Sequence, residues 1–165
     1  MARDVRLMMA DDPEFPASLR EIPHPPFGLY YRGTLPSQEQ ILFAIVGTRK
    51  ASPAGKEIAK RFAYSLGQAG FVIVSGLAFG IDSAAHEGCM NANAPTIAIL
   101  ASSPDRVSPK YHEYLGRQIL KTGGAIVSEH PPGFIPRKLH FLERNRVVSG
   151  MSKGVLVIEA PERSG

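Results

Sequence analysis

The chain is poor in the residues that support several classes of site. Its 165 residues include one cysteine, Cys89, and no tryptophan. A single cysteine excludes a disulfide framework and a zinc site built on several cysteines. The longest apolar run covers only residues 41–46, whereas a membrane span needs about 18 residues. We therefore expect a cytoplasmic protein with no membrane segment, no bound metal and no cofactor.

The first twelve residues also lack the apolar stretch of a secretory signal, and five of them are charged. The composition as a whole, 44% hydrophobic and 21% charged, excludes a disordered chain. It is sufficient for a single domain with a buried core.

Proline and charge are abundant but unevenly placed. Residues 1–40 hold six of the 14 prolines, with four basic and six acidic residues, a net charge of −2. Residues 41–165 hold fifteen basic and nine acidic residues, a net charge of +6. Because proline fixes φ and removes a hydrogen-bond donor, we expect residues 1–40 to form an irregular arm packed on the main domain. We expect a short strand within it at residues 29–32.

From residue 41 the pattern alternates between strands and helices. Strands are predicted at 41–47, 71–74, 96–101, 125–128 and 154–160, with helices after Ser52, at 81–91, at 110–121 and at 139–149. This alternation predicts βαβ units. We expect an α/β fold over residues 41–165: an open, doubly wound, mainly parallel Rossmann-like sheet with helices on both faces.

In such sheets ligands bind beyond the carboxyl ends of the strands. The first predicted strand ends in Gly47, and Arg49 and Lys50 follow in the turn before a helix N-terminus that suits a phosphate. Neither G-x-G-x-x-G nor G-x-x-x-x-G-K-[ST] is present. The turn is therefore either a phosphate site or an ordinary tight turn with exposed basic residues.

A second basic segment lies at residues 137–153, with five basic residues and one acidic residue. It combines these cations with Phe141, which can stack on a base, and Asn145, which can bond a base or a phosphate. Phe79, after the second strand, is another candidate for stacking, although phenylalanine more often packs in a core. The alternative for the charge is a solvated face.

No nucleophile, base and acid stand together in the sequence, so no catalytic residue is assigned. Asp82 and His86 are four residues apart on one helix face. They suit acid–base or metal chemistry, but no second cluster with metal-ligand spacing accompanies them. We favour a local structural pair.

These segments together resemble the DNA-processing protein family called DprA or Smf. Residues 47–49, Gly-Thr-Arg, resemble the family's G-S-R loop, and residues 75–82 resemble its S-G-x-A-x-G-I-D segment, with Phe79 where arginine is frequent. Residues 12–33, 128–150 and 159–165 resemble further family segments in the same order. The resemblance implies that the family's domain continues beyond residue 165, so we expect the domain to be incomplete at its C-terminal end.

The resemblance implies a protein that binds and protects single-stranded DNA, assists loading of RecA recombinase in natural transformation, forms a homodimer and is not an enzyme. The candidate DNA-binding residues, from the resemblance and from the loops above, are Gly47, Thr48, Arg49, Lys50, Gly76, Phe79, Gly80, Lys138, Phe141, Arg144, Asn145 and Arg146. Two alternatives stay open: a Rossmann-like binder or sensor of a small nucleotide-derived ligand, and an inactive scaffold.

Overall fold

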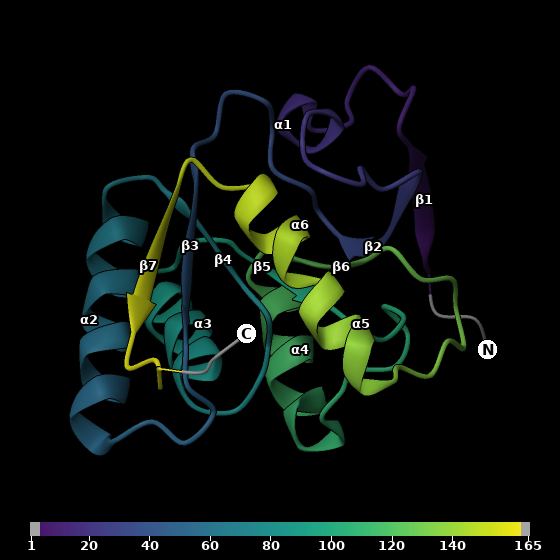
Figure 1. Cartoon of the computed structure of the whole chain (residues 1–165). Coiled ribbons are helices and arrows are strands. Elements are labelled where there is room, and N and C mark those ends of the chain that lie inside the picture. Colours follow the sequence, from purple (N-terminus) through teal and green to yellow (C-terminus); the bar gives the residue numbers. More distant parts are fainter. Residues whose placement is uncertain (1–3, 163–165) are drawn as a thin grey trace.

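Seven strands form one sheet in the order β1-β2-β6-β5-β4-β3-β7 (Figure 1). The structure, a computed structural model, describes residues 4–162, so the family segment at 163–165 lies outside the described residues. The strands are β1 (Arg6–Met9), β2 (Gly28–Gly33), β3 (Leu42–Gly47), β4 (Val72–Ser75), β5 (Thr96–Leu100), β6 (Ala125–Ser128) and β7 (Gly154–Ile158). β3 to β7 are parallel, and β1 and β2 are antiparallel to their neighbours. The α/β fold with a mainly parallel sheet is confirmed.

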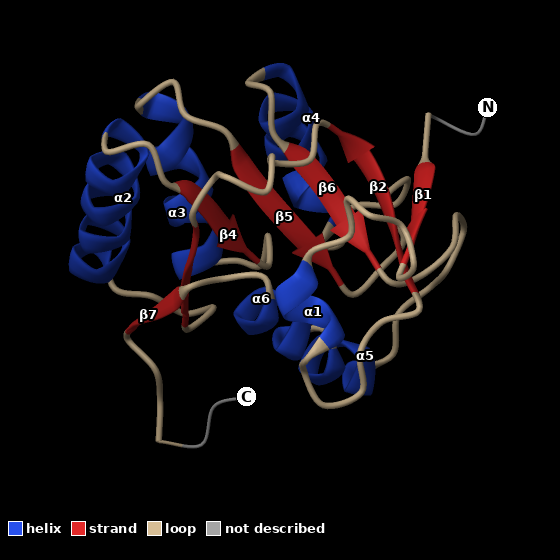
Figure 2. Cartoon of the chain, turned by 90° about the horizontal axis from the view of Figure 1, so that it is seen from above, coloured by secondary structure: helices blue, strands red, loops and turns tan. Residues whose placement is uncertain are grey.

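Helices cover both faces of the sheet (Figure 2). One face carries α2 (Pro53–Gln68), α3 (Ile81–Asn91) and α4 (Glu113–Lys121), which a short 3₁₀ turn, η1 (Lys110–His112), precedes. The other face carries α1 (Ala17–Arg20), α5 (Lys138–Glu143) and α6 (Asn145–Gly150). With helices on both sides, the central strands β4, β5 and β6 are buried along their whole length, as their unbroken apolar runs predict.

The helix predicted at 139–149 is two short helices that meet at Arg144. The carbonyl of Arg144 accepts a hydrogen bond from the amide of Val147, three residues on, at 2.9 Å. This closer spacing is that of a 3₁₀ turn, which tightens the chain between α5 and α6.

The N-terminal segment is more regular than its prolines predict. β2 confirms the expected short strand, and it pairs antiparallel with β6, Tyr30 lying opposite Ser128. β1, which the sequence did not predict, pairs in turn with β2. The prolines fall between and after these strands, and Phe15 and Leu19 are fully buried in the core beneath α6. The irregular arm is therefore not confirmed, because two of its stretches extend the same sheet.

The strand order places a topological switch point between β3 and β7. From β3 the chain proceeds through β4, β5 and β6 toward one edge, and it then returns by α5 and α6 to place β7 on the other side of β3. The helices on either side of this point lie on opposite faces of the sheet (Figure 2), so a crevice opens at the carboxyl ends of β3 and β7. No helix within residues 4–162 is long and apolar enough to cross a membrane.

Candidate functional site

A cleft of about 810 Å³ lies at the switch point. The β3–α2 loop, the end of β4, α5, α6 and the end of β7 all line it. It brings together nine of the twelve candidate residues: Gly47, Thr48, Arg49, Lys50, Gly76, Phe141, Arg144, Asn145 and Arg146. Two basic segments almost a hundred residues apart in sequence therefore form one surface.

The β3–α2 loop is held close to the end of β7. A Cβ atom at Gly47 would lie 1.9 Å from the carbonyl oxygen of Ile158, so only glycine fits there. The amide of Thr48 donates to the carbonyl of Glu159 at 2.8 Å. This anchoring leaves Arg49 exposed at the cleft, with its guanidinium carbon 5.4 Å from the ring centroid of Phe141. A cation and an aromatic face thus stand together, the pair that binds a phosphate and stacks a base.

The N-terminus of α2 has a carboxylate of the chain itself as its partner. Ser52 caps α2, its side chain accepting from the amide of Gly55 at 3.0 Å. The carboxylate of Glu159 accepts from the Ser52 amide at 2.8 Å and from the Ser52 hydroxyl. These hydrogen bonds lower the pKa of the exposed Glu159. Glu159 therefore occupies the position at this helix N-terminus where a phosphate was expected. An external anion can still bind the cations of the loop, Arg49 and Lys50.

Arg144 forms the floor of the cleft and is 7% exposed. Its guanidinium donates to the carbonyl of Gly76 at 2.8 Å and to that of Ile99, and its Nε donates to the side chain of Asn145 at 3.3 Å. Burial lowers the pKa of Arg144, while the nearby Asp82 raises it. This candidate DNA contact is thus held by backbone carbonyls and supports the residues around it.

Asp82 and His86 have separate partners in the interior. Asp82 accepts from the amides of Gly76 and Ala78 at 3.1 and 3.3 Å, and burial raises its pKa although Arg144 lowers it. His86 is fully buried, and its Nδ1 bonds the hydroxyl of Thr96 at 2.8 Å. Within residues 4–162 no group of three or more His, Cys, Asp and Glu side chains could hold a metal ion.

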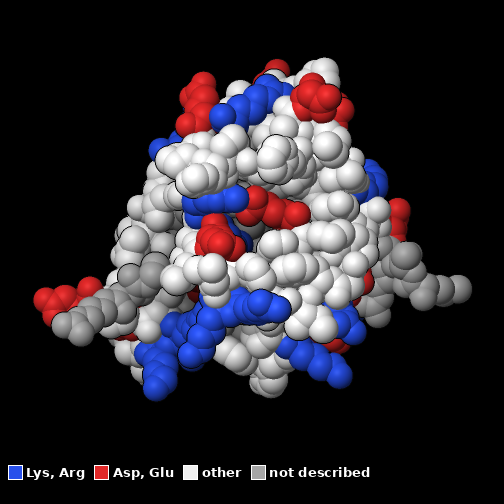
Figure 3. All heavy atoms as spheres, turned by 45° about the vertical axis from the view of Figure 1, so that its right-hand side comes forward, with Lys and Arg blue, Asp and Glu red and all other residues white. Residues whose placement is uncertain are grey.

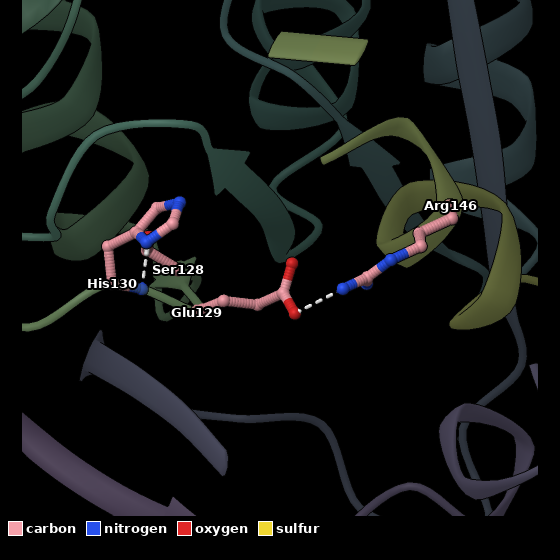
Figure 4. Close-up of polar contacts among 4 residues, drawn as sticks. All are labelled: Ser128, Glu129, His130 and Arg146. Carbon is pink, nitrogen blue, oxygen red and sulfur yellow. Dashed lines mark hydrogen bonds and ion pairs between the residues drawn. The ribbon is translucent and has the colours of Figure 1, made fainter. Parts of the chain in front are cut away.

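Arg146 stands where the cleft meets a second hollow beside β1 and β2. Its Nη2 pairs with Oε1 of Glu129 at 2.6 Å, across the gap between α6 and the segment after β6 (Figure 4). Its Nη1 is buried and has no hydrogen-bond partner within the part of the chain that the structure describes. An unmet guanidinium donor of this kind is suited to an anionic oxygen from outside the chain.

Three candidate residues lie beside the cleft. Phe79 and Gly80 line a neighbouring cavity that shares Arg49 with it. Lys138 begins α5 and is exposed, three residues before Phe141, so both residues lie on one helix face. The basic character extends over the surface, where Lys and Arg gather along the lower edge of the face in Figure 3.

Sequence reasoning missed Glu129 and Glu159 and gave Asp82 a different partner. Glu129 pairs with Arg146, Asp82 lies near Arg144, and Glu159 bonds Ser52, which caps α2. Each of them follows a strand or opens a helix at the carboxyl edge of the sheet, and that position is the signal that could have identified them.

Residues 6–165 match the family described as DNA recombination-mediator protein A. The chain is 42% identical to a Protein Smf of Synechocystis sp. over 99% of its own length and 42% of the relative's. It is 37% identical to the DNA processing protein DprA of Bacillus subtilis over 92% of its own length and 51% of the relative's. The chain thus spans about half the length of these relatives.

Two solved structures have the same fold over 98% of the chain. The X-ray structure of DNA processing protein A from Streptococcus pneumoniae superposes with a TM-score of 0.90 at 35% identity, over 56% of that protein. The same protein from Helicobacter pylori, solved for its single-stranded DNA binding mode, superposes with a TM-score of 0.83 at 30% identity, over 72% of that protein.

Proposed function

Because this chain belongs to the DNA recombination-mediator protein A family, we propose that its cleft binds single-stranded DNA. The observation that carries the proposal is the meeting of Arg49, Arg146 and the ring of Phe141 in one crevice, with a buried donor of Arg146 unmet. Arginine neutralises phosphates and an aromatic ring stacks any base, so binding is nearly independent of sequence and weakens with salt.

The contacts we propose fall into two kinds. Phosphates meet the cations of the cleft, and a base meets the aromatic ring, with the Asn145 side chain beside it. The residues proposed to touch DNA are Gly47, Thr48, Arg49, Lys50, Lys138, Phe141, Asn145 and Arg146. We propose that Gly76 and Arg144 support this surface instead, because Arg144 is buried against the Gly76 carbonyl.

We further propose that the protein binds without catalysing a reaction. Ser149, a hydroxyl of the cleft, bonds carbonyls of its own helix, and both His86 and His112 are buried with partners elsewhere. Protection of single-stranded DNA, help in loading RecA, a homodimer and a cytoplasmic location belong to the same proposal and follow from the family. They are tested by RecA filament formation on coated single strands and by sedimentation.

The direct test is fluorescence anisotropy with a labelled oligo-dT. Arg49→Ala and Arg146→Ala should each weaken binding by roughly ten- to a hundredfold, because a hydrogen bond to a charged group is worth about 1.5–3 kcal/mol. Arg61→Ala is the matched control, since Arg61 is an exposed arginine of α2 in another surface hollow. Equal affinities for all four proteins would refute the assignment of the cleft.

The alternative, a small nucleotide-derived ligand, is tested in the same samples. The cleft volume is in the range of small-molecule sites, but Glu159 takes the helix N-terminus that such folds offer to a phosphate. A rise in melting temperature with AMP or ADP-ribose, without any binding of oligo-dT, would favour that ligand over DNA.

A further inference from the structure

Three aromatic side chains stand exposed on the α4 side of Arg49. Tyr111 is 82% exposed, Tyr114 65% and Phe79 44%. The ring of Phe79 lies 5.9 Å from that of Tyr111 and 4.7 Å from that of the buried His112. We call Phe79, Tyr111 and Tyr114 the aromatic patch. Such a group of large rings facing solvent is a recognition surface rather than a core.

The aromatic patch is tied to the loop that carries Arg49. Gly80 has φ +82°, and a Cβ atom there would lie 2.2 Å from the carbonyl oxygen of Thr48, so the β4–α3 loop rests directly on the β3–α2 loop. The amide of Ile81 donates to that same carbonyl at 3.3 Å. On the other side, Nδ1 of His112 donates to the carbonyl of Leu77 at 2.8 Å and joins η1 to the loop.

Cations accompany the rings. The aromatic patch lines a cavity of about 640 Å³ together with Arg49 and Lys56, and Arg49 also lines the cleft. The carboxylate in this cavity, Glu87, is paired with Lys60 at 2.7 Å. A DNA strand that leaves the cleft past Arg49 therefore meets a second cation, Lys56, and the three rings of the aromatic patch.

We propose that the aromatic patch is a second base-stacking subsite, which extends the path of single-stranded DNA from the cleft past Arg49. The inference rests on the proposed function and deepens it. The occupant is a nucleic acid strand because rings interleaved with phosphate-neutralising cations, continuous with the proposed DNA cleft, form a stacking platform that tolerates any sequence. A longer oligonucleotide uses both subsites, and a short one fills the cleft alone.

The test compares oligo-dT of about 4 and about 15 nucleotides by anisotropy. The double variant Tyr111→Leu/Tyr114→Leu removes two rings and keeps apolar bulk. It should lower the affinity for the longer oligonucleotide by roughly tenfold or more. Its affinity for the short strand should stay unchanged. The double variant Tyr111→Phe/Tyr114→Phe keeps the rings and should bind both strands like the unmodified protein. Tyr64→Leu, which removes an exposed tyrosine of α2, is the site control.

The outcomes separate the two proposals. If the unmodified protein binds both strands and the double leucine variant binds the longer one equally well, the second subsite is refuted while the cleft stands. If the unmodified protein binds neither strand, both proposals fall. If the leucine variant keeps its DNA affinity and instead loses self-association in sedimentation, the patch joins two copies of the chain. Photocrosslinking of 5-iodouracil DNA to Tyr111 or Tyr114, mapped by mass spectrometry, would support the subsite directly.

Discussion

Replacing Arg144 by alanine should destabilise the protein far more than replacing any exposed cation of the cleft. Arg144 is 7% exposed, and its guanidinium donates from the second basic segment to the carbonyls of Gly76 and Ile99. In Arg144→Ala both carbonyls lose this donor, and the buried carboxylate of Asp82 loses its neighbouring positive charge. Leaving two buried carbonyls without a donor and a buried carboxylate without its nearby cation costs about 3–5 kcal/mol of unfolding free energy.

That loss is a large part of the stability of a domain, which is about 5–15 kcal/mol. With a urea dependence of about 2 kcal/mol per molar, the unfolding midpoint should fall by about 1.5–2.5 M. The assay is urea unfolding followed by circular dichroism. The double variant Asp82→Asn/Arg144→Met removes both charges. It should recover part of the lost unfolding free energy, because the asparagine carboxamide at position 82 needs no counter-ion.

One result would refute this reasoning. If Arg144→Ala lost less than about 1 kcal/mol of unfolding free energy and still lost its affinity for oligo-dT, Arg144 would be a DNA contact rather than a support. That outcome would return Arg144 to the role that the sequence alone predicts for it.

Two further predictions concern neighbouring groups. Burial lowers the pKa of His86 to about 3, so the unfolded chain binds a proton below about pH 6.5 while the folded chain does not. The free energy of unfolding should therefore fall by about 2 kcal/mol between pH 7 and pH 5. His86→Gln should lose this part of the pH dependence in urea titrations, and an unchanged pH profile would contradict the assignment. Glu129→Gln removes the partner charge of Arg146, so binding of oligo-dT should become roughly two- to fivefold tighter at low salt and converge with the unmodified protein at high salt. Weaker binding of that variant would mean that Glu129 orients Arg146 instead of competing for it.

The sequence predicts the sheet well because its central parallel strands, β4, β5 and β6, are buried on both faces. The runs that became β3, β4, β5, β6 and β7 are continuous and apolar. Ser52 caps α2, and Gly70 and Gly123 follow the ends of α2 and α4. β1 escaped prediction because it is four residues long and three of them are exposed, so its apolar pattern is weak. It forms a strand because it pairs with the edge strand β2, and this tertiary contact cannot be read from the local sequence.

The cations of the candidate site could be predicted from the sequence, whereas its carboxylates could not. Arg49 and Arg146 belong to dense basic segments, so a basic surface follows from composition and fold class. The partners Glu129 and Glu159 are distant in sequence from the groups they bind, by 17 and 107 residues. Only the packing of the sheet brings them together. The same holds for Arg144, whose charge predicts a DNA contact and whose burial supports the structural role that we propose for it.

The central claim is that phosphates of single-stranded DNA bind the cations of the cleft. The measurement that tests it most directly is the salt dependence of oligo-dT affinity for the unmodified protein and for Arg49→Ala. If Arg49 neutralises one phosphate, the slope of log affinity against log salt should become shallower by about 0.7 in the variant. Binding that does not respond to salt, or a slope that Arg49→Ala leaves unchanged, would contradict the account.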